Sequence, residues 1–146
     1  MRKLNTPRGF TLIEVLVVIG IIAILASIVI IAINPQRQFQ QANNTQRWSN
    51  VNAILNAVHQ YAVDNHGQLP TTTPAVATEI CKRSAVSCVG LVDLNMLVPT
   101  YVVDIPVDPT CGSVNGTCYN ISTATGTRIT VTAPSAELGQ SITVNR

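Results

Sequence analysis

Residues 10–33 form an apolar run that constrains the fold of this chain more than any other feature. Of its 24 residues, only Thr11, Glu14, Gly20 and Ser27 are neither strongly apolar nor Ala. As a helix that rises 1.5 Å per residue, the run would be about 36 Å long, enough to cross a hydrocarbon core of about 30 Å. Its Leu, Ile, Val and Phe residues together favour insertion by roughly 8 kcal/mol, whereas Glu14 opposes it by at most about 3 kcal/mol. The sequence therefore predicts a membrane-spanning helix.

The residues on either side of the run predict its orientation. Arg2, Lys3 and Arg8 precede it without any acidic residue, and positively charged flanks stay on the cytoplasmic side. Everything after Ile33 should then be exported. An ordinary secretory signal is the alternative, but its apolar region is about 7–15 residues long and ends at an Ala-x-Ala-like site. The run here is longer, and no such site follows it directly.

Composition excludes several classes of protein. Charged residues make up only 11% of the 146-residue chain, and Gly and Pro occur eight times each. These values do not fit a disordered polymer, a collagen-like repeat or a basic protein that coats nucleic acid. The sequence has no Gly-rich phosphate loop, nucleophile elbow or pair of metal ligands. We therefore expect no enzyme activity, no cofactor and no metal, with His59 a solvated helix residue and His66 part of a helix-ending turn.

An acidic side chain inside a membrane span requires an explanation. Glu14 could be protonated or reach the interface at modest cost, but an ionisable group in a membrane ordinarily has a charged partner. No Lys or Arg lies between Phe10 and Pro35. The partner must therefore come from another chain, from a new amino terminus or from solvent.

The residues around Glu14 carry a resemblance to a known family. Residues 8–15 read Arg-Gly-Phe-Thr-Leu-Ile-Glu-Val, after a short basic leader and ahead of the long apolar run. This pattern resembles the class III signal of type IV pilins and type II secretion pseudopilins. In that family a prepilin peptidase cuts after the glycine and methylates the new amino terminus. The resemblance implies cleavage between Gly9 and Phe10 and N-methylation of Phe10.

The same resemblance supplies a partner for Glu14. In the family, the new amine pairs with this glutamate on a neighbouring subunit, which makes a buried carboxylate tolerable and would fix the register between subunits. The implied partners are other copies of the chain, other pilins, the prepilin peptidase, an inner-membrane assembly platform and, before assembly, membrane lipid. We expect a single pass through the cytoplasmic membrane with the N-terminus in the cytoplasm, and then an extracellular surface filament.

Cleavage would also change the charge of the chain. Removal of residues 1–9 takes away three of nine cations and leaves six against seven acids. The mature net charge is then about −1, so the formal charge of +2 for the whole sequence indicates no strong nucleic-acid binding.

A second helical segment is predicted after the apolar run. Pro35 removes a helix hydrogen bond and clashes with the preceding turn, so we expect it to cause a kink or local break near residues 31–35. One face of the following helix is apolar, Phe39, Ala42 and Trp48 are expected to extend it less regularly, and Asn-His-Gly at residues 65–67 should end the helix. The apolar face consists of Val51, Ile54, Leu55, Val58, Tyr61 and Ala62.

Two further patterns extend the resemblance. Ile-Asn-Pro at residues 33–35, followed by Gln46-Arg47 and a closing Tyr…Asp-Asn…Gly…Pro pattern at residues 61–70, resembles a pilin-like subgroup. Residues 94–109, predicted to be a short helical turn and an extended loop, resemble the Leu-x-Pro-x-Tyr…Pro-x-Asp-Pro segment of pseudopilins. Some major pseudopilins bind calcium just downstream through clustered acids. Here Glu137 is the only acid after Asp108, which argues against that site.

The four cysteines lie in the part of the chain predicted to be exported. Six residues separate Cys81 from Cys88, and six separate Cys111 from Cys118, unlike the Cys-x-x-Cys spacing of zinc sites. Disulfides are the natural state outside the cytoplasm, and a head of about 80 residues profits from them. Of the three possible pairings we favour the local one, Cys81–Cys88 with Cys111–Cys118; free buried thiols are the alternative.

The C-terminal part alternates in the manner of β-strands. Residues 119–122, 126–133 and 140–144 are rich in Thr, Val, Ile and Tyr. Three antiparallel strands on the apolar helix face would give a pilin-like α+β fold, with a long N-terminal helix packed on a small sheet. The expected parts are a leader peptide at residues 1–9, a transmembrane and assembly helix at 10–33, the amphipathic half of the helix at 34–66 and a globular head at 67–146.

Three functions follow in order of preference. The first is a structural subunit of a type IV pilus or pilus-like surface filament, processed by prepilin peptidase and polymerised through its N-terminal helix. The alternative is a pseudopilin of a type II secretion or DNA-uptake apparatus. A membrane-anchored exported enzyme or binding protein is a remote alternative, because no motif supports it.

Overall fold

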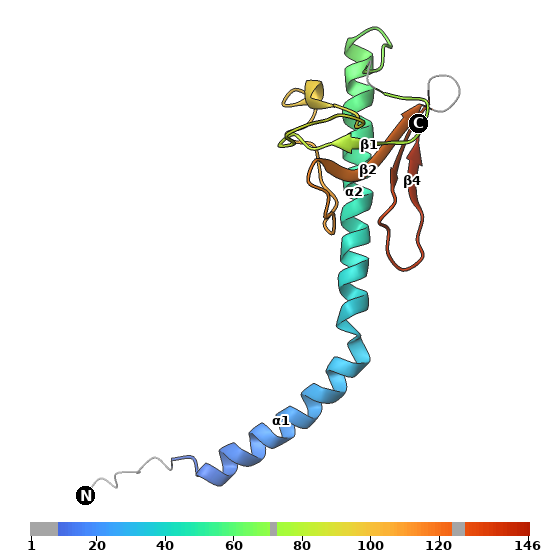
Figure 1. The fold of residues 1–146 in the computed structure, drawn as a ribbon. Helices are drawn as coiled ribbons and strands as arrows, with labels where there is room; N and C mark the ends of the chain where they lie inside the picture. The colour runs from blue at the N-terminus through green and yellow to red at the C-terminus, as the bar shows by residue number, and fades with distance from the viewer. Residues whose placement is uncertain (1–8, 71–72, 124–127) are drawn as a thin grey trace, which may run out of the picture. The chain divides into compact units, whose positions relative to one another are not determined.

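The computed structural model describes residues 9–70, 73–123 and 128–146. The chain divides into two compact units, Met1–Gln38 and Phe39–Arg146, which are described separately below. The order of helices followed by an antiparallel sheet confirms the predicted α+β class (Figure 1). In chain order the elements are α1 (Leu12–Ile33), α2 (Pro35–Asp64), β1 (Thr78–Cys81), a 3₁₀ turn (Asn95–Leu97), β2 (Gly116–Thr123), β3 (Ile129–Ala133) and β4 (Ile142–Asn145).

The first unit contains α1 and the first turn of α2. Its helical run is interrupted at Asn34, whose φ of 49° and ψ of 77° are left-handed; Asn tolerates this conformation better than most residues. Asn34 also starts the next helix, because its carbonyl oxygen accepts a hydrogen bond of 3.1 Å from the backbone N–H of Arg37. Pro35 is the first residue of α2, where a missing N–H costs nothing. The interruption therefore lies one residue before the proline.

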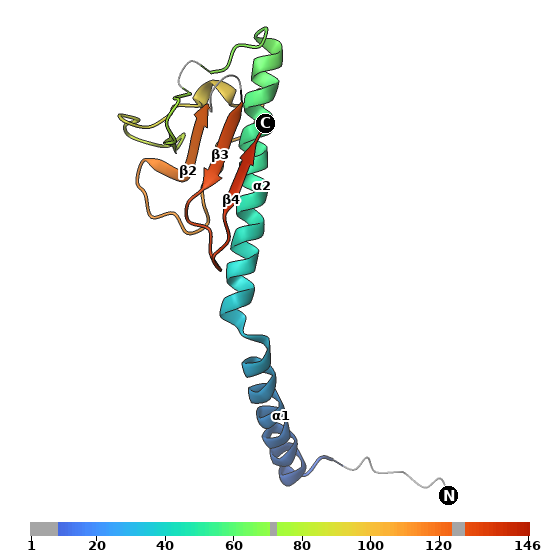
Figure 2. The same ribbon diagram turned by 90° about the vertical axis from the view of Figure 1, so that its right-hand side faces the viewer.

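The second unit, Phe39–Arg146, is called the head from here on. It is built around a four-stranded antiparallel sheet in the order β1-β2-β3-β4 (Figure 2). Ile121 of β2 lies opposite Thr78 of β1 and Val131 of β3, and Val131 lies opposite Val144 of β4. The prediction of three strands is wrong by one, because β1 was missed. The predicted strand at 126–133 begins in the structure at Ile129, and its first two residues lie outside the described ranges.

The core of this unit lies between the sheet and α2. Alternate residues of β3 are buried, as a strand with one covered face requires. The face of the sheet that they occupy packs on the apolar face of α2 (Figures 1 and 2). The 3₁₀ turn, predicted as a short helical turn, adds Leu97 to this core. The buried members include Val51, Ile54, Leu55 and Val58 from α2, and Ile80, Tyr119, Ile121, Ile129, Val131 and Ile142 from the strands.

The N-terminal part of α2 departs from the predicted apolar face. Phe39 is 71% exposed and Trp48 is 41% exposed, so neither extends the core. Polar side chains occupy the buried side of the helix instead, and these are Asn44, Arg47 and Asn50. The physical reason is that these side chains have polar partners: Asn44 and Arg47 bind residues of two loops, and Asn50 binds the hydroxyl group of Tyr119 in β2.

The C-terminal end of α2 follows the predicted helix stop. The helix ends at Asp64, and the backbone N–H of Gly67 donates to the carbonyl oxygen of Ala62 at 2.7 Å. His66 and Gly67 both have positive φ values, 58° and 85°. Glycine adopts this left-handed conformation without strain, which is why it suits a position just beyond a helix end.

Candidate functional site

The first candidate site is the N-terminal end of α1. Thr11 Oγ1 accepts a hydrogen bond of 3.3 Å from the backbone N–H of Glu14. In return, Glu14 Oε2 accepts hydrogen bonds of 2.8 Å from both the backbone N–H and the hydroxyl group of Thr11. This reciprocal pair is a capping box, which satisfies N–H groups that the first helical turn leaves free. The cap fixes the Glu14 carboxylate in the first turn of α1, four residues after Phe10, the residue expected to become the new amino terminus.

Glu14 forms no ion pair among the residues that the structure describes. Within residues 9–70, 73–123 and 128–146, two ion pairs are present, and both belong to Arg47 of the head. The hydrogen bonds from Thr11 orient the Glu14 carboxylate but do not neutralise it. The Glu14 carboxylate is therefore held in a defined position at the start of α1.

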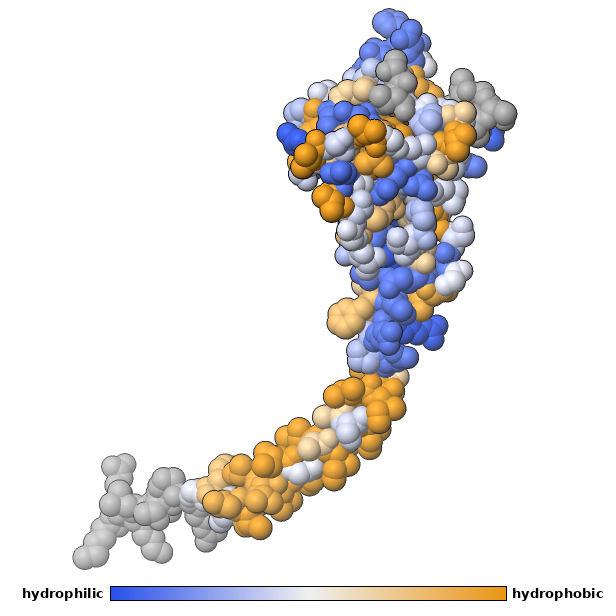
Figure 3. Space-filling view, viewed as in Figure 1, coloured by the Kyte–Doolittle hydropathy of each residue, from blue (hydrophilic) through white to orange (hydrophobic). Residues whose placement is uncertain are grey.

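The rest of α1 exposes an apolar surface on every side. Each of its Leu, Ile and Val residues is at least 50% exposed, and Phe10, ahead of the helix, is 89% exposed. Figure 3 shows this surface as almost continuously hydrophobic. Among the described residues, α1 is the one helix long and apolar enough to cross a membrane. A helix that is apolar all round is stable only when lipid or other protein covers it, so α1 fits a membrane anchor.

The second candidate site is a buried cation in the head. Arg47 of α2 is fully buried, and its Nε lies 2.7 Å from Asp108 Oδ2. Its Nη1 lies 2.7 Å from Glu137 Oε2, and its Nη2 donates to Thr110 Oγ1 at 2.7 Å and to Asp108 Oδ1 at 3.2 Å. One guanidinium group thereby joins α2 to two loops that lie far apart in the sequence.

Two asparagines on the same side of α2 extend this network. Asn44 Nδ2 donates to the carbonyl oxygen of Glu137 at 2.8 Å, and Asn44 Oδ1 accepts from the backbone N–H of Glu137 at 3.0 Å. Asn50 Nδ2 donates to the hydroxyl oxygen of Tyr119 at 2.9 Å. The buried polar side of α2 is therefore hydrogen-bonded, as buried polar groups must be.

This network was not predicted, although the amino-acid sequence contains a signal for it. Arg47 precedes Val51 by four residues and therefore lies on the same helix face as the apolar stripe. A charged residue that continues a buried stripe needs a buried partner. From the sequence, Asp108 was assigned to the pseudopilin-like Pro-x-Asp-Pro segment, and Glu137, as the one acid after it, argued against a calcium site. The pairing of Arg47 with these two acids, across 61 and 90 residues, cannot be read from local spacing.

The network shifts the pKa values of its members in consistent directions. Burial favours the neutral form of Asp108, but hydrogen bonds from Arg47 and Thr110 outweigh it and hold the pKa of this carboxyl group below its usual value. Hydrogen bonds from Arg47 and then Asn43 lower the pKa of Glu137. The hydrogen bonds to Asp108 raise the pKa of Arg47 despite its burial. All three groups are therefore charged at neutral pH.

The four cysteines form two disulfides in the head. Cys81 is bonded to Cys88 and Cys111 to Cys118, with Cα–Cα distances of 5.6 and 5.7 Å. This is the local pairing favoured from the sequence. The first disulfide closes the loop after β1, and the second ends within β2.

Two groups of side chains resemble metal ligands but have other partners. The Glu79 carboxylate and the sulfurs of Cys111 and Cys118 lie within 4.8 Å of one another, yet both sulfurs belong to a disulfide and cannot act as thiolate ligands. Asp108 and Glu137, the acids considered for calcium, both bind the guanidinium group of Arg47.

The two histidines lie near the C-terminal end of α2. His66 belongs to the turn beyond the helix, as predicted. The prediction that His59 is a solvated residue is wrong, because its ring is half-buried and its Nε2 is buried without a hydrogen-bond partner in the described part of the chain. The ring lines an open groove formed with the C-terminal residue Arg146.

The predicted site residues are divided between the two units. Glu14 lies in the first turn of α1, Gly9 and Phe10 precede that helix in the chain, and Pro35 starts α2 in the same unit. The two disulfides and the Arg47 network belong to the second unit.

Comparisons with known proteins match both parts of the chain. A family model described as a prokaryotic N-terminal methylation motif matches residues 4–33. The type II secretion system core protein G of Escherichia coli K12 is 35% identical over 111 residues, which cover 75% of this chain and 70% of that protein.

Other relatives carry the same description. Core protein G of Vibrio cholerae serotype O1 is 33% identical over 82 residues, covering 56% of this chain and 54% of that protein. The Klebsiella michiganensis protein is 37% identical over 84 residues, covering 58% of this chain and 56% of that protein. The chain thus spans little more than half the length of these two relatives. No solved structure matches the chain significantly.

Proposed function

The chain belongs to the family of type IV pilins and type II secretion pseudopilins, and from that premise we propose that it is a structural subunit of a pilus-like filament. The observation that supports this most strongly is α1, a helix that is apolar on every side and carries one capped carboxylate in its first turn. Such a helix suits two environments in succession, first lipid and then a bundle of identical helices.

Of the two filaments expected from the sequence, the relatives favour the pseudopilin of a type II secretion apparatus. The three relatives described above are all core protein G of such a system. The head of this chain contains no group that we assign to catalysis, and the buried Arg47 network joins its parts instead. We therefore propose a structural role and not an enzymatic one.

The proposed processing begins at the residues ahead of the capping box. Prepilin peptidase would cut between Gly9 and Phe10 and methylate the amine of Phe10, while the basic residues before Gly9 hold the leader on the cytoplasmic side. The new amine of Phe10 would lie four residues before Glu14 in the same chain and would pair with Glu14 of a neighbouring copy. An unpaired charge in an apolar core costs about 3–5 kcal/mol, so this pairing would set the register of the polymer.

Substitutions of Glu14 test the pairing. Glu14→Gln retains a side chain that can complete a capping box with Thr11 but removes the charge, and Glu14→Ala removes both. We expect both variants to insert and to be processed normally. Both should assemble more than about a hundred-fold less than the wild type, because each leaves the neighbouring amine unpaired. Filament yield from cells, normalised to processed subunit in the membrane, is the measurement.

Ser27→Ala is the matched control. Ser27 lies in α1 and its hydroxyl group donates only to the carbonyl oxygen of Ile24, at 2.7 Å, so this variant should assemble like the wild type. If Glu14→Gln assembled normally while Glu14→Ala did not, the glutamate would act through its cap and the proposed ion pair would be wrong.

A further inference from the structure

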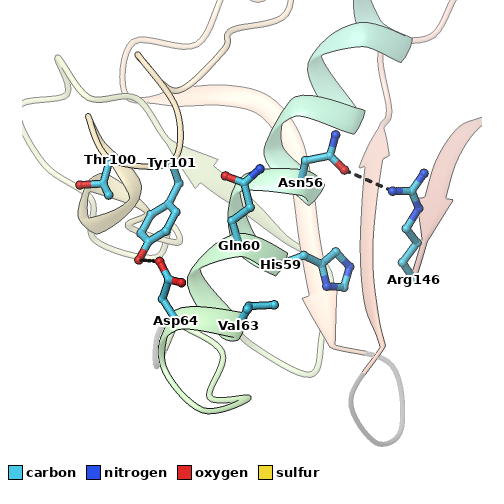
Figure 4. A pocket seen from close by; sticks show the side chains of 8 residues that line it. All are labelled: Asn56, His59, Gln60, Val63, Asp64, Thr100, Tyr101 and Arg146. Carbon is cyan, nitrogen blue, oxygen red and sulfur yellow. Dashed lines mark hydrogen bonds between the residues drawn. The ribbon is translucent and has the colours of Figure 1, made fainter.

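The outer face of α2 forms the floor of an open groove on the head. The cavity measures about 630 Å³ and runs across the last turns of the helix (Figure 4). In Figure 4, Thr100 and Tyr101 stand on one side of the helix and Arg146 on the other. The lining residues are Asn56, His59, Gln60, Val63, Asp64, Thr100, Tyr101 and Arg146.

The floor of the groove is uncharged, whereas its two sides carry opposite charges. Val63 of the floor is 79% exposed. On one side Asp64 Oδ2 accepts a hydrogen bond of 2.9 Å from the Tyr101 hydroxyl group. On the other, Arg146 Nη1 donates to Asn56 Oδ1 at 3.2 Å. Neither charge takes part in an ion pair within the part of the chain that the structure describes, so both can pair with a ligand.

A different part of the head carries the complementary pattern. Arg83 and Asp104 both line a smaller surface cavity and are both exposed, and neither is ion-paired among the described residues. Val86, three residues after Arg83, is 94% exposed, and Val103, directly before Asp104, is 85% exposed. We call these four residues the loop surface. The loop surface presents a cation, two apolar side chains and an anion. The groove presents the complementary groups: the anion Asp64, the apolar Val63 and the cation Arg146.

The loop surface is held in place before any partner binds. The Cys81–Cys88 disulfide closes the loop that carries Arg83 and Val86. The backbone N–H of Val86 also donates to Asn115 Oδ1 at 3.3 Å. A preorganised loop loses little conformational freedom on binding, which favours its use as a contact.

We propose that the loop surface of one copy docks into the groove of a second copy. Arg83 would pair with Asp64, Asp104 with Arg146, and Val86 would cover Val63. The groove and the loop surface share no residue, so the contact is heterologous and leaves one free groove and one free loop surface at the ends of any chain of copies. A heterologous contact that does not close into a ring produces an open helical polymer. This inference rests on the proposed filament function and names a contact between heads within it.

Photo-cross-linking tests the contact in the assembled full-length protein. Benzoylphenylalanine at position 86 should link to residues 56–64 or 100–101 of another copy, identified by mass spectrometry of the linked peptides. Val76 supplies the matched control, since it is 74% exposed in the same head but lies outside both surfaces; a probe there should not link to the groove. Links from position 86 to another protein, to lipid or to a different part of a second copy would overturn the proposal.

Charge reversal tests the pairing of Arg83 with Asp64. Asp64→Lys and Arg83→Glu should each lower the yield of the cross-link about two- to five-fold, the range for an exposed ion pair, and the double variant should restore it. Val76→Lys adds a charge at an exposed position outside both surfaces, so it should leave the yield unchanged. A double variant no better than either single variant would contradict the pairing.

The same preparation separates failure of this contact from failure of the proposed function. If the wild type assembles while position 86 does not link to the groove, the head contact is wrong and the filament function stands. If the wild type stays unassembled and retains residues 1–9, both the head contact and the proposed filament function are wrong.

Discussion

Arg47 shows how one residue can organise a small head. Its guanidinium group lies at the centre of contacts to Asp108, Thr110 and Glu137, and these hold two loops against α2. Burying a cation is costly, and the cost is offset here by two carboxylates and by hydrogen bonds to its remaining N–H groups. A buried ion pair of this kind fixes the arrangement of the loops more than it adds to stability.

Arg47→Met tests this role. It leaves Asp108 buried without its partner, so we expect the free energy of unfolding to fall by about 3–5 kcal/mol. Urea unfolding of the full chain in detergent, followed by the fluorescence of Trp48, the single tryptophan, measures the change. Arg83→Met, at an exposed position, should change stability by less than about 0.5 kcal/mol. Equal effects of the two variants would contradict a structural role for the network.

The same network predicts a dependence of stability on acid. The pKa values of Asp108 and Glu137 are lower in the folded head than the ordinary values of about 3.9 and 4.3. At pH values between the folded-state and the unfolded-state pKa values, the unfolded chain therefore binds more protons than the folded one. The stability that both carboxylates confer is fully present above about pH 5 and falls as the pH drops through and below 4.

Urea midpoints measured between pH 7 and pH 2 check this dependence. The wild type should lose stability steeply below pH 4. The variant that combines Asp108→Asn with Glu137→Gln should be less stable at pH 7 and should show a flatter curve in acid. A wild-type curve as flat as that of the variant would show that these carboxylates do not carry the acid sensitivity.

At the scale of residues, the sequence singled out Glu14 in α1 and the disulfide pairing of the head, but not the buried network around Arg47. Glu14 stands out because it is the one acid in an apolar run, and a local rule explains its capping box. Arg47 and His59 were not understood because their surroundings come from loops and a strand end far away in the chain. Burial by distant segments leaves no local pattern.

At the scale of elements, caps and cross-links define where structure begins and ends. Asn34 ends α1 in a left-handed conformation and starts α2 with its own carbonyl oxygen. Pro35 marks the break to within one residue. Because Pro is tolerated at the first position of a helix, α2 begins at Pro35 and the interruption lies just before it. β1 was missed because it has only four residues and two of them are Glu and Cys, which gives no strand alternation.

The disulfides should contribute measurably to the stability of the head. Replacing Cys111 and Cys118 by Ser opens a short loop, and we expect the free energy of unfolding to fall by about 2–3 kcal/mol. The same urea experiment measures it. Ser84→Ala, at an exposed position in the other disulfide loop, should change stability by less than about 0.5 kcal/mol. No loss of stability in the Cys variant would show that the packing of the head needs no cross-link.

At the scale of the whole molecule, the two units solve different problems of burial. The second unit has its own core between α2 and the sheet. The first unit has none, since α1 buries no residue within the chain. The apolar surface of α1 must be covered by lipid or by further copies of the chain. This requirement could be predicted from the sequence because it depends only on the length and composition of the helix. The contacts of a polymer were not, because they depend on surfaces that only the folded head creates.

The amino terminus of the assembled protein tests the central claim most directly. Intact mass and tandem mass spectrometry of subunits taken from purified filaments should show a chain that begins at N-methylated Phe10, with the carboxylate of Glu14 unmodified. Subunits in the filament that still carry residues 1–9 would contradict the account, because no new amine would then exist to neutralise Glu14 of a neighbouring copy.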